Sequence, residues 1–173
     1  ATFVMDRGYD DNKMFLKLDA LKQDYVIRLT SKRSLFFHGK WVSATHLRNQ
    51  RKGKIKTPLL FRGKYHDAYL SHVKVQITAS KKDIYLVLVY GLTEHPMMLA
   101  TNKEIKSKED VIKVAKTYFS RWRIEEYFRC KKQMFQFENF RVRKLAAINA
   151  LNFYITLCMA FLAHMSMKSE TNA

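Results

Sequence analysis

The order of apolar and polar positions in the first thirty residues predicts a strand, a helix and a second strand. A short apolar run over Thr2–Met5 ends at Asp6, and a turn follows it. Apolar residues then recur at the spacing of an amphipathic helix over roughly 11–22. The segment 25–30 is rich in β-forming residues and is the second expected strand. This order is typical of a βαβ piece of an α/β sheet.

Between residues 31 and 101 the pattern changes to one that favours β-structure. Apolar and polar residues alternate over 72–77, as in a half-exposed strand. Residues 80–83 favour a hairpin turn, which precedes an apolar strand over 84–90. A further short strand is expected over 97–101. We therefore expect a β-rich region that follows an α/β start.

A single long helix is predicted from a capping box at Ser107–Asp110 to about Lys132. On this helix Tyr118, Arg121, Glu125 and Lys132 fall within about 60° of one another, because an α-helix turns about 100° per residue. Such a face, with one aromatic, two cations and one carboxylate, can bind a polyanion and a metal ion together. The alternative is a ladder of ion pairs, in which Glu125 pairs with cations one turn away.

A second C-terminal helix is expected over Leu145–Met165. Its apolar stretch 145–163 is long enough to suggest a membrane span. Polar side chains at Asn149, Asn152 and Thr156 interrupt this stretch, and we favour a buried helix over a membrane span.

The excess of basic residues indicates which kinds of partner the protein binds. The chain has 173 residues with 32 Lys and Arg against 15 Asp and Glu, which gives a formal net charge of +17. A domain this basic is attracted to nucleic acid or to an anionic membrane surface. The tract 28–66 contains no acidic residue, and we expect it to follow the DNA backbone. Trp41 in this tract is a candidate for stacking on an unpaired base, with a position in the core as the alternative.

Two carboxylates are candidates for a metal site. Cleaving or joining DNA phosphodiesters commonly uses two Mg²⁺ ions about 4 Å apart, held by hard oxygen ligands. Asp6 at the end of a strand and Glu125 on a helix are plausible partners for such ions. Asp10, Asp11 and Glu126 compete with them on sequence alone. A third carboxylate is expected, and no other expected strand ends in an obvious candidate.

The same residues carry a resemblance to a known family. The spacing of four residues resembles the Tyr-Arg-Glu-Lys signature of bacterial insertion-sequence transposases of the DDE class. These residues are Tyr118, Arg121, Glu125 and Lys132. Trp122 also matches the usual text around that signature. Residues 4–10 resemble the second acidic motif of the group, and 99–102 its short strand before the signature helix. The likeness spans residues 2 to about 160.

The resemblance implies an α/β, RNase H-like catalytic fold that is partial, lacks its N-terminal strands, and is interrupted by a β-rich insertion. In this division 1–30 and 102–173 belong to the RNase H-like core, and 31–101 is the insertion. It also implies that Asp6 and Glu125 are catalytic carboxylates and ligands of a two-metal site that holds Mg²⁺ or Mn²⁺.

The resemblance further implies that Tyr118, Arg121 and Lys132 hold transposon-end DNA near the scissile phosphate. Arg and Lys neutralise phosphates, and Tyr can hydrogen-bond to one while it packs on a sugar. Arg123 and Arg129 are expected to add phosphate contacts, with an ordinary surface role as the alternative.

The expected function is that of a fragment of a DNA transposase, which catalyses metal-dependent phosphodiester hydrolysis and strand transfer at transposon ends. The expected partners are transposon-end DNA, target DNA and a second copy of the chain in a homodimer, and no membrane is expected among them. The expected location is the bacterial cytoplasm, at the nucleoid when the protein is bound to DNA. The family's first catalytic Asp lies upstream of Asp6, so the chain alone is expected to be inactive. The alternatives are a non-catalytic DNA-binding remnant of a truncated transposase, and a membrane-surface protein anchored by 145–163.

Overall fold

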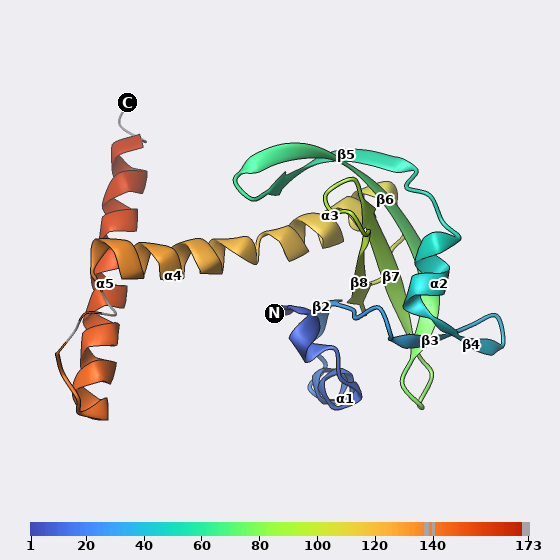
Figure 1. Cartoon of the computed structure of the whole chain (residues 1–173), viewed down its shortest axis with the longest axis horizontal. Helices are drawn as coiled ribbons and strands as arrows, with labels where there is room; N and C mark the ends of the chain where they lie inside the picture. The colour runs from blue at the N-terminus through green and yellow to red at the C-terminus, as the bar shows by residue number, and fades with distance from the viewer. Residues whose placement is uncertain (137–138, 140, 171–173) are drawn as a thin grey trace. The chain divides into compact units, whose positions relative to one another are not determined.

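The computed structural model describes residues 1–136, 139 and 141–170, with the side chains of 167–170 left aside. The chain forms two compact units, Ala1–Trp122 and Arg123–Ala173, and each is described by itself. The first, called here the sheet unit, contains a mixed β-sheet with helices α1, α2 and α3 (Figure 1). The second, called here the helical unit, contains α4 from its second residue onward and α5.

The N-terminal strand–helix–strand order is confirmed. Strand β1 (Thr2–Met5) leads into a short 3-10 turn, η1 (Arg7–Tyr9), and then into helix α1 (Asn12–Ala20). Strand β2 (Asp24–Arg28) returns parallel to β1, with Thr2 opposite Asp24 and Met5 opposite Ile27. Because the two strands run in parallel, their carboxyl ends reach the same edge of the sheet.

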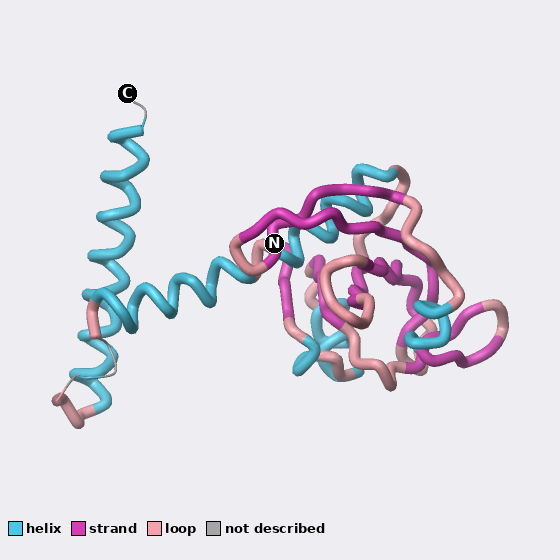
Figure 2. The backbone as a smooth tube through the Cα atoms, turned by 45° about the horizontal axis from the view of Figure 1, so that its top comes forward, coloured by secondary structure: helices cyan, strands magenta, loops and turns pink. Residues whose placement is uncertain are grey.

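The β-rich stretch continues the same sheet. Its strands are β3 (Ser34–Phe37), β4 (Lys40–Ser43), β5 (Ile55–Phe61), β6 (Lys64–Ile77), β7 (Lys82–Tyr90) and β8 (Met97–Thr101). The order in space is β1-β2-β8-β7-β6-β3-β4. Strand β5 pairs with β6 in a long hairpin, which Figure 2 shows as two neighbouring magenta segments. Strand β8 lies between β2 and β7 and is antiparallel to both. The division of these strands between an RNase H-like core and an insertion stays a prediction.

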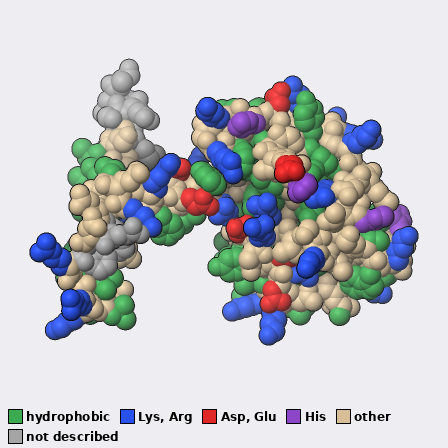
Figure 3. All heavy atoms as spheres, viewed as in Figure 1, with side chains coloured by type: hydrophobic (Ala, Val, Ile, Leu, Met, Phe, Trp, Pro, Cys, Tyr) green, Lys and Arg blue, Asp and Glu red, His purple; other side chains and the backbone are tan. Residues whose placement is uncertain are grey.

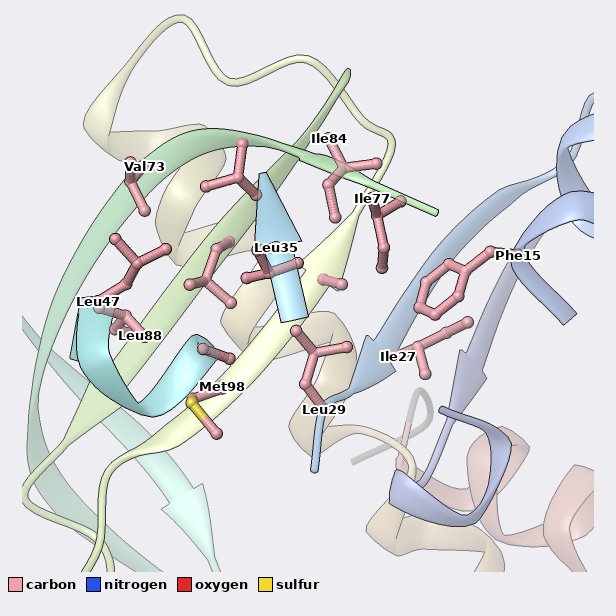
Figure 4. Close-up of a cluster of buried hydrophobic side chains, with 14 of the residues drawn as sticks. Phe15, Ile27, Leu29, Leu35, Leu47, Val73, Ile77, Ile84, Leu88 and Met98 are labelled. Carbon is pink, nitrogen blue, oxygen red and sulfur yellow. The ribbon is translucent and has the colours of Figure 1, made fainter. Parts of the chain in front are cut away.

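Both faces of the sheet are covered by apolar side chains. On one face, α1 and α2 (Ala44–Asn49) pack with the sheet around Phe15, Ile27 and Leu35, which are fully buried (Figure 4). The six-residue helix α2, capped by Ser43, was not predicted. On the other face, α3 (Lys108–Phe119) packs on β-strand residues through its own apolar side. Each fully buried Leu, Ile or Phe side chain stabilises such a core by about 1.5–3 kcal/mol.

The predicted single helix through Lys132 is wrong, because a turn at 120–121 separates α3 from α4 (Trp122–Met134). The predicted capping box that starts α3 is confirmed. At its other end, Ser120 Oγ donates to the carbonyl oxygen of Thr117 at 2.7 Å, and Arg121 N–H donates to that of Tyr118 at 3.1 Å. Both bonds take up carbonyl groups of the last turn of α3. The first is a side-chain bond of the kind that bends helices, and the second is an i→i−3 backbone bond typical of a tightened helix end.

The second C-terminal helix is confirmed, but its predicted burial is wrong. Helix α5 (Leu145–Glu170) exposes large apolar side chains, among them Phe153, Phe161 and Met165, and Figure 3 shows such side chains on its visible face. Only 6% of its most apolar window is buried. By length and composition alone, the stretch Leu145–Ser166 is long and apolar enough to cross a membrane.

Two of the three polar residues that interrupt the apolar pattern of α5, Asn152 and Thr156, contact α4. Lys131 on α4 is 5% exposed, and its Nζ donates to Asn152 Oδ1 at 2.6 Å and to Thr156 Oγ1 at 2.8 Å. The Tyr127 hydroxyl also donates to Thr156 Oγ1, at 3.1 Å. These side chains therefore join the two helices of the helical unit by polar contacts.

Candidate active site and nucleic-acid groove

Asp6 follows β1 directly, at the sheet edge where the parallel strands β1 and β2 end. It is partly buried, and its Oδ1 accepts a hydrogen bond from the Arg7 N–H at 2.7 Å, which caps η1. Its Oδ2 accepts no hydrogen bond from any other described residue, and so is available to a ligand. Crevices outside the carboxyl ends of parallel strands are the usual ligand sites of α/β sheets.

The other acidic candidates have structural roles. The carboxylate of Asp10 is fully buried, pairs with Arg33 at 2.6 Å, and accepts from Thr30. Asp11 accepts from Lys13 N–H and caps α1. Glu126 pairs with an Arg on the next turn of α4. Asp6 is therefore the residue of the N-terminal acidic motif that remains a candidate metal ligand.

The Asp6 carboxylate lines an open hollow of about 840 Å³, called here the Asp6 hollow. Its lining brings together the carboxyl ends of β1 and β2, the start of β8 and one side chain of α2. Its polar lining residues are Asp6, Arg7, Arg28, Thr30, Ser31, Lys32, Arg48 and His95. One carboxylate thus stands among four cations, an arrangement suited to a phosphate that approaches a carboxylate-bound metal.

Tyr118 lies beside this hollow, near the end of α3, and is 4% exposed. Burial raises the pKa of its hydroxyl; the Asp6 charge adds to that rise, while the guanidinium groups of Arg28 and Arg121 oppose it. The Arg121 guanidinium lies 5.9 Å from the centre of the Tyr118 ring. The hydroxyl is therefore protonated at neutral pH, as in an ordinary tyrosine, and can donate a hydrogen bond to an anion.

A second hollow of about 190 Å³, called here the aromatic hollow, adjoins the first and shares Arg28 and Met97 with it. Three guanidinium groups and four aromatic rings line it: Arg28, Arg62, Arg121, Phe61, Tyr118, Phe119 and Trp122. This lining suits phosphate groups and the flat faces of sugars or bases. Two of the predicted DNA-binding residues, Tyr118 and Arg121, are therefore brought together here.

Sequence analysis missed Arg28 and Arg62 as individual site residues. Arg28 is the last residue of β2, and β2 ends beside the strand that carries Asp6. Its position beside Asp6 follows from the parallel pairing of β1 and β2, which the βαβ pattern already indicated. Arg62 lies at the tip of the β5–β6 hairpin, and no pattern in the sequence connects it with α3.

Trp41 lies on β4 and is 48% exposed, so the alternative that it sits in the core is wrong. Its ring stands edge-on to that of Phe36, with 5.4 Å between ring centres. It lines a third hollow, of about 380 Å³, called here the Trp41 hollow. The indole is therefore held by a neighbouring ring while part of it remains open to a ligand.

The remaining predicted residues belong to the helical unit. Glu125 and Lys132 are seven residues apart on α4 and therefore share one face of that helix. Glu125 is partly buried, whereas Lys132, Arg123 and Arg129 are exposed. Arg129 pairs with Glu126, three residues before it. The approach of Glu125 to Asp6 across the two units stays a prediction.

The described residues contain no group of three or more His, Cys, Asp or Glu side chains placed to hold a metal ion. Within the sheet unit, Asp6 offers one carboxylate oxygen of the hard type that Mg²⁺ prefers. A second carboxylate, that of Glu125, is offered by the helical unit. The carboxylate oxygens of Asp6 and Glu125 are both suited to Mg²⁺ or Mn²⁺. Neither residue alone forms a metal site.

Comparison with known proteins points to one family. The chain matches the protein-family model described as Transposase DDE domain over residues 1–161. A search of curated proteins gives no match. The matched range includes both the Asp6 motif and α4 with Glu125.

Proposed function

Because this chain belongs to the Transposase DDE domain family, we propose that it acts in metal-dependent DNA hydrolysis and strand transfer at transposon ends. One observation supports the proposal above the others: the available carboxylate of Asp6 faces a hollow whose walls carry Arg28, with Tyr118 and Arg121 beside it. This combination places anion-binding groups around one carboxylate at a strand end.

In this proposal Asp6 and Glu125 hold the divalent ions, for which Mg²⁺ or Mn²⁺ is the expected choice. Bound ions of this kind activate an attacking oxygen and stabilise a leaving one. The guanidinium groups of Arg28 and Arg121 neutralise the phosphates next to the reacting one. The protonated Tyr118 hydroxyl donates to a phosphate oxygen, and its ring packs against Arg121.

The helical unit contributes the rest of the proposed end-binding surface. Lys132 shares a face of α4 with Glu125, while Arg123 and Arg129 extend the positive charge on that helix. We propose that two copies act together, because transposition requires two transposon ends to be brought together. The isolated 173 residues supply two of the three carboxylates that the resemblance implies, so we expect no strand transfer from them alone.

The first test separates chemistry from binding in the full-length transposase. We expect Asp6→Asn and Glu125→Gln to abolish cleavage of a transposon-end duplex, because each removes one anionic ligand while it keeps the side chain's shape. End binding should remain close to that of the wild type. Matched controls are Asp67→Asn and Glu104→Gln, which change exposed carboxylates that pair with surface lysines. Unchanged cleavage by Glu125→Gln would show that the carboxylate assignment is wrong.

The second test concerns the end-binding residues. Arg121→Ala should weaken binding to the transposon end and lower the slope of log K against log salt by about 0.9, the value for one lost phosphate contact. The control Lys106→Ala removes an exposed cation that already pairs with Glu104. An Arg121→Ala protein with the wild-type salt slope would contradict a phosphate contact.

A second candidate function is non-catalytic DNA binding by a remnant of a transposase. The observation that favours it is the formal net charge of +17, which accounts for DNA binding without any metal chemistry. Both candidates predict DNA binding with a steep salt dependence. Cleavage of a transposon end by the wild-type full-length protein, lost in Asp6→Asn, decides for the enzyme.

A further inference from the structure

We propose that two copies of this protein form a dimer through the outer face of the long β5–β6 hairpin (Figure 1). Six residues make up this surface, called here the hairpin face: Lys56, Pro58, Leu60, Tyr65, Asp67 and Tyr69. The inference rests on the proposed function for the need of two copies, and it adds the surface at which they meet.

The alternation of side chains along the hairpin separates a buried inner face from an exposed outer one. The inner face packs with α3, and its buried residues are Leu59, Ala68 and Leu70. The hairpin face is the opposite side, because successive residues of a strand point to opposite faces of a sheet. On it Tyr65 is 75% exposed, Leu60 45% and Tyr69 42%. The hairpin therefore presents three large, partly apolar side chains to solvent on one side.

The hairpin face is one continuous patch. The register of the two strands sets its residues in three opposite pairs, which are Lys56 with Tyr69, Pro58 with Asp67, and Leu60 with Tyr65. The Cβ atoms of such pairs lie about 4.5–5.5 Å apart, so each side chain is in reach of its neighbours. Exposed apolar patches of this kind mark interaction surfaces, and tyrosine is enriched where two proteins meet.

The charge of the hairpin face favours a second copy over DNA. Its single cation, Lys56, pairs with its single carboxylate, Asp67, at 2.6 Å. Asp67 is also the only acidic residue between Asp24 and Asp83 in the sequence. The face therefore carries no net charge, although the protein has a formal net charge of +17. Two such basic molecules repel each other least where their surfaces are neutral, whereas a DNA backbone is bound by an excess of cations.

The hairpin face is also complementary to itself. A two-fold interface uses the same patch on both copies, so that patch must match its own image. Because the face carries one charge of each sign, a two-fold axis in the plane of the interface can place Lys56 against Asp67 of the partner subunit. The tyrosines then pack between the two copies, where their rings lose contact with water.

The edge of the hairpin is less suited to pairing than its face. In the described sheet β5 pairs with β6 alone, so its other side is an edge. Pro58 lies in the middle of β5, and proline occurs in edge strands where its missing N–H would face outward. A further strand could therefore not bond along the whole edge. Contact through the face closes as a dimer, whereas strand addition at an edge can continue from copy to copy.

The experiment measures the dimer dissociation constant of the full-length transposase by sedimentation velocity, with and without a transposon-end duplex. We expect Tyr65→Ala to raise this constant about a hundredfold, because truncating a central tyrosine costs about tenfold and a two-fold interface contains the change twice. Tyr65→Phe keeps the ring and should stay within about threefold of the wild type. The control Leu16→Ala removes an exposed apolar side chain of α1 and should leave the dimer unchanged.

Charge reversal tests whether the contact is between copies. Lys56→Asp and Asp67→Lys each place like charges across the interface, so each protein alone should be largely monomeric. An equal mixture of the two should form mixed dimers, which no role within a single copy predicts. The matched control is the exposed pair of Lys74 with Asp83, whose reversed variants should dimerise as the wild type does. Neutral changes such as Asp67→Asn should have little effect, because an exposed ion pair is worth little.

A wild-type protein that stays monomeric with and without DNA would overturn the inference. So would an unchanged dimer in Tyr65→Ala, or a mixture of the two charge-reversed proteins that stays monomeric. Weaker binding of a single transposon end by monomeric Tyr65→Ala would assign the hairpin face to DNA instead, and would also overturn it. These outcomes leave the proposed function standing, since loss of cleavage in Asp6→Asn tests that function separately.

Discussion

Replacing Arg33 by Ala tests whether the buried ion pair with Asp10 holds the loop beside the candidate active site. Arg33 Nε donates to Asp10 Oδ1 at 2.6 Å, and a second guanidinium nitrogen donates to the carbonyl oxygen of Asp10 at 2.7 Å. A third bond runs to Asn12 Oδ1 at 2.5 Å. The Asp10 side chain is 0% exposed and that of Arg33 is 12% exposed, so both charges of the pair are largely withdrawn from solvent.

The expected loss can be worked from these contacts. Removing one partner of a buried ion pair costs about 3–5 kcal/mol, because the remaining charge is left without compensation. Asp10 keeps two hydrogen bonds from Thr30 in the Arg33→Ala protein, which places the loss at the lower end, about 3 kcal/mol. The double variant Asp10→Ala/Arg33→Ala leaves no buried charge, so its loss should fall about 2 kcal/mol short of the sum of the two single losses.

The assay is equilibrium urea unfolding, followed by the fluorescence of the two tryptophans. Lys56→Ala is the matched control, because its ion pair with Asp67 is more than half exposed on both sides, and it should change the free energy of unfolding little. A loss below about 1 kcal/mol for Arg33→Ala, or additive losses in the double variant, would refute the reasoning.

Three further predictions concern other residues. Tyr25→Phe should raise the free energy of unfolding by about 1 kcal/mol, because the Tyr25 hydroxyl is buried without a hydrogen-bond partner among the described residues; an unchanged value would contradict this. Burial raises the pKa of Tyr25 and of Tyr118, so the folded state keeps both protons more tightly. The contribution of these two tyrosines to stability should therefore be constant below about pH 10 and be lost above it, so stability should fall less steeply above pH 10 in Tyr25→Phe, as urea unfolding at each pH will show. Lys131→Met should leave Asn152 and Thr156 without their charged donor and speed amide hydrogen exchange in α5, and protection equal to the wild type would count against the polar contacts.

Local patterns were sufficient to predict the parts of the fold that depend on neighbouring residues. The parallel pairing of β1 and β2 followed from strand, helix and strand in order, and the predicted bounds of β8 are those observed. The capping box at Ser107 was readable because it joins residues only three positions apart. These predictions required no knowledge of distant contacts.

Other features depend on contacts that no local pattern contains. The apolar spacing from Val111 to Phe128 is continuous, yet α3 ends at Phe119, where Ser120 and Arg121 bond to carbonyl oxygens of its last turn. The role of Asp10 depends on Arg33, which lies 23 positions away. Periodicity could therefore not separate Asp6, the proposed metal ligand, from the structural Asp10, although the two stand four residues apart.

The distribution of the predicted residues between two units has a consequence for how the protein works. Asp6, Tyr118 and Arg121 belong to the sheet unit, whereas Glu125 and Lys132 belong to the helical unit. The sheet unit alone therefore carries the proposed anion-binding groove together with only one of the proposed metal ligands. If Arg28 binds phosphate as proposed, it does so from the sheet unit, so the salt dependence of DNA binding and the metal dependence of cleavage are expected to respond to different substitutions. A Glu125→Gln protein that lost both properties together would show that α4 is needed to form the groove itself.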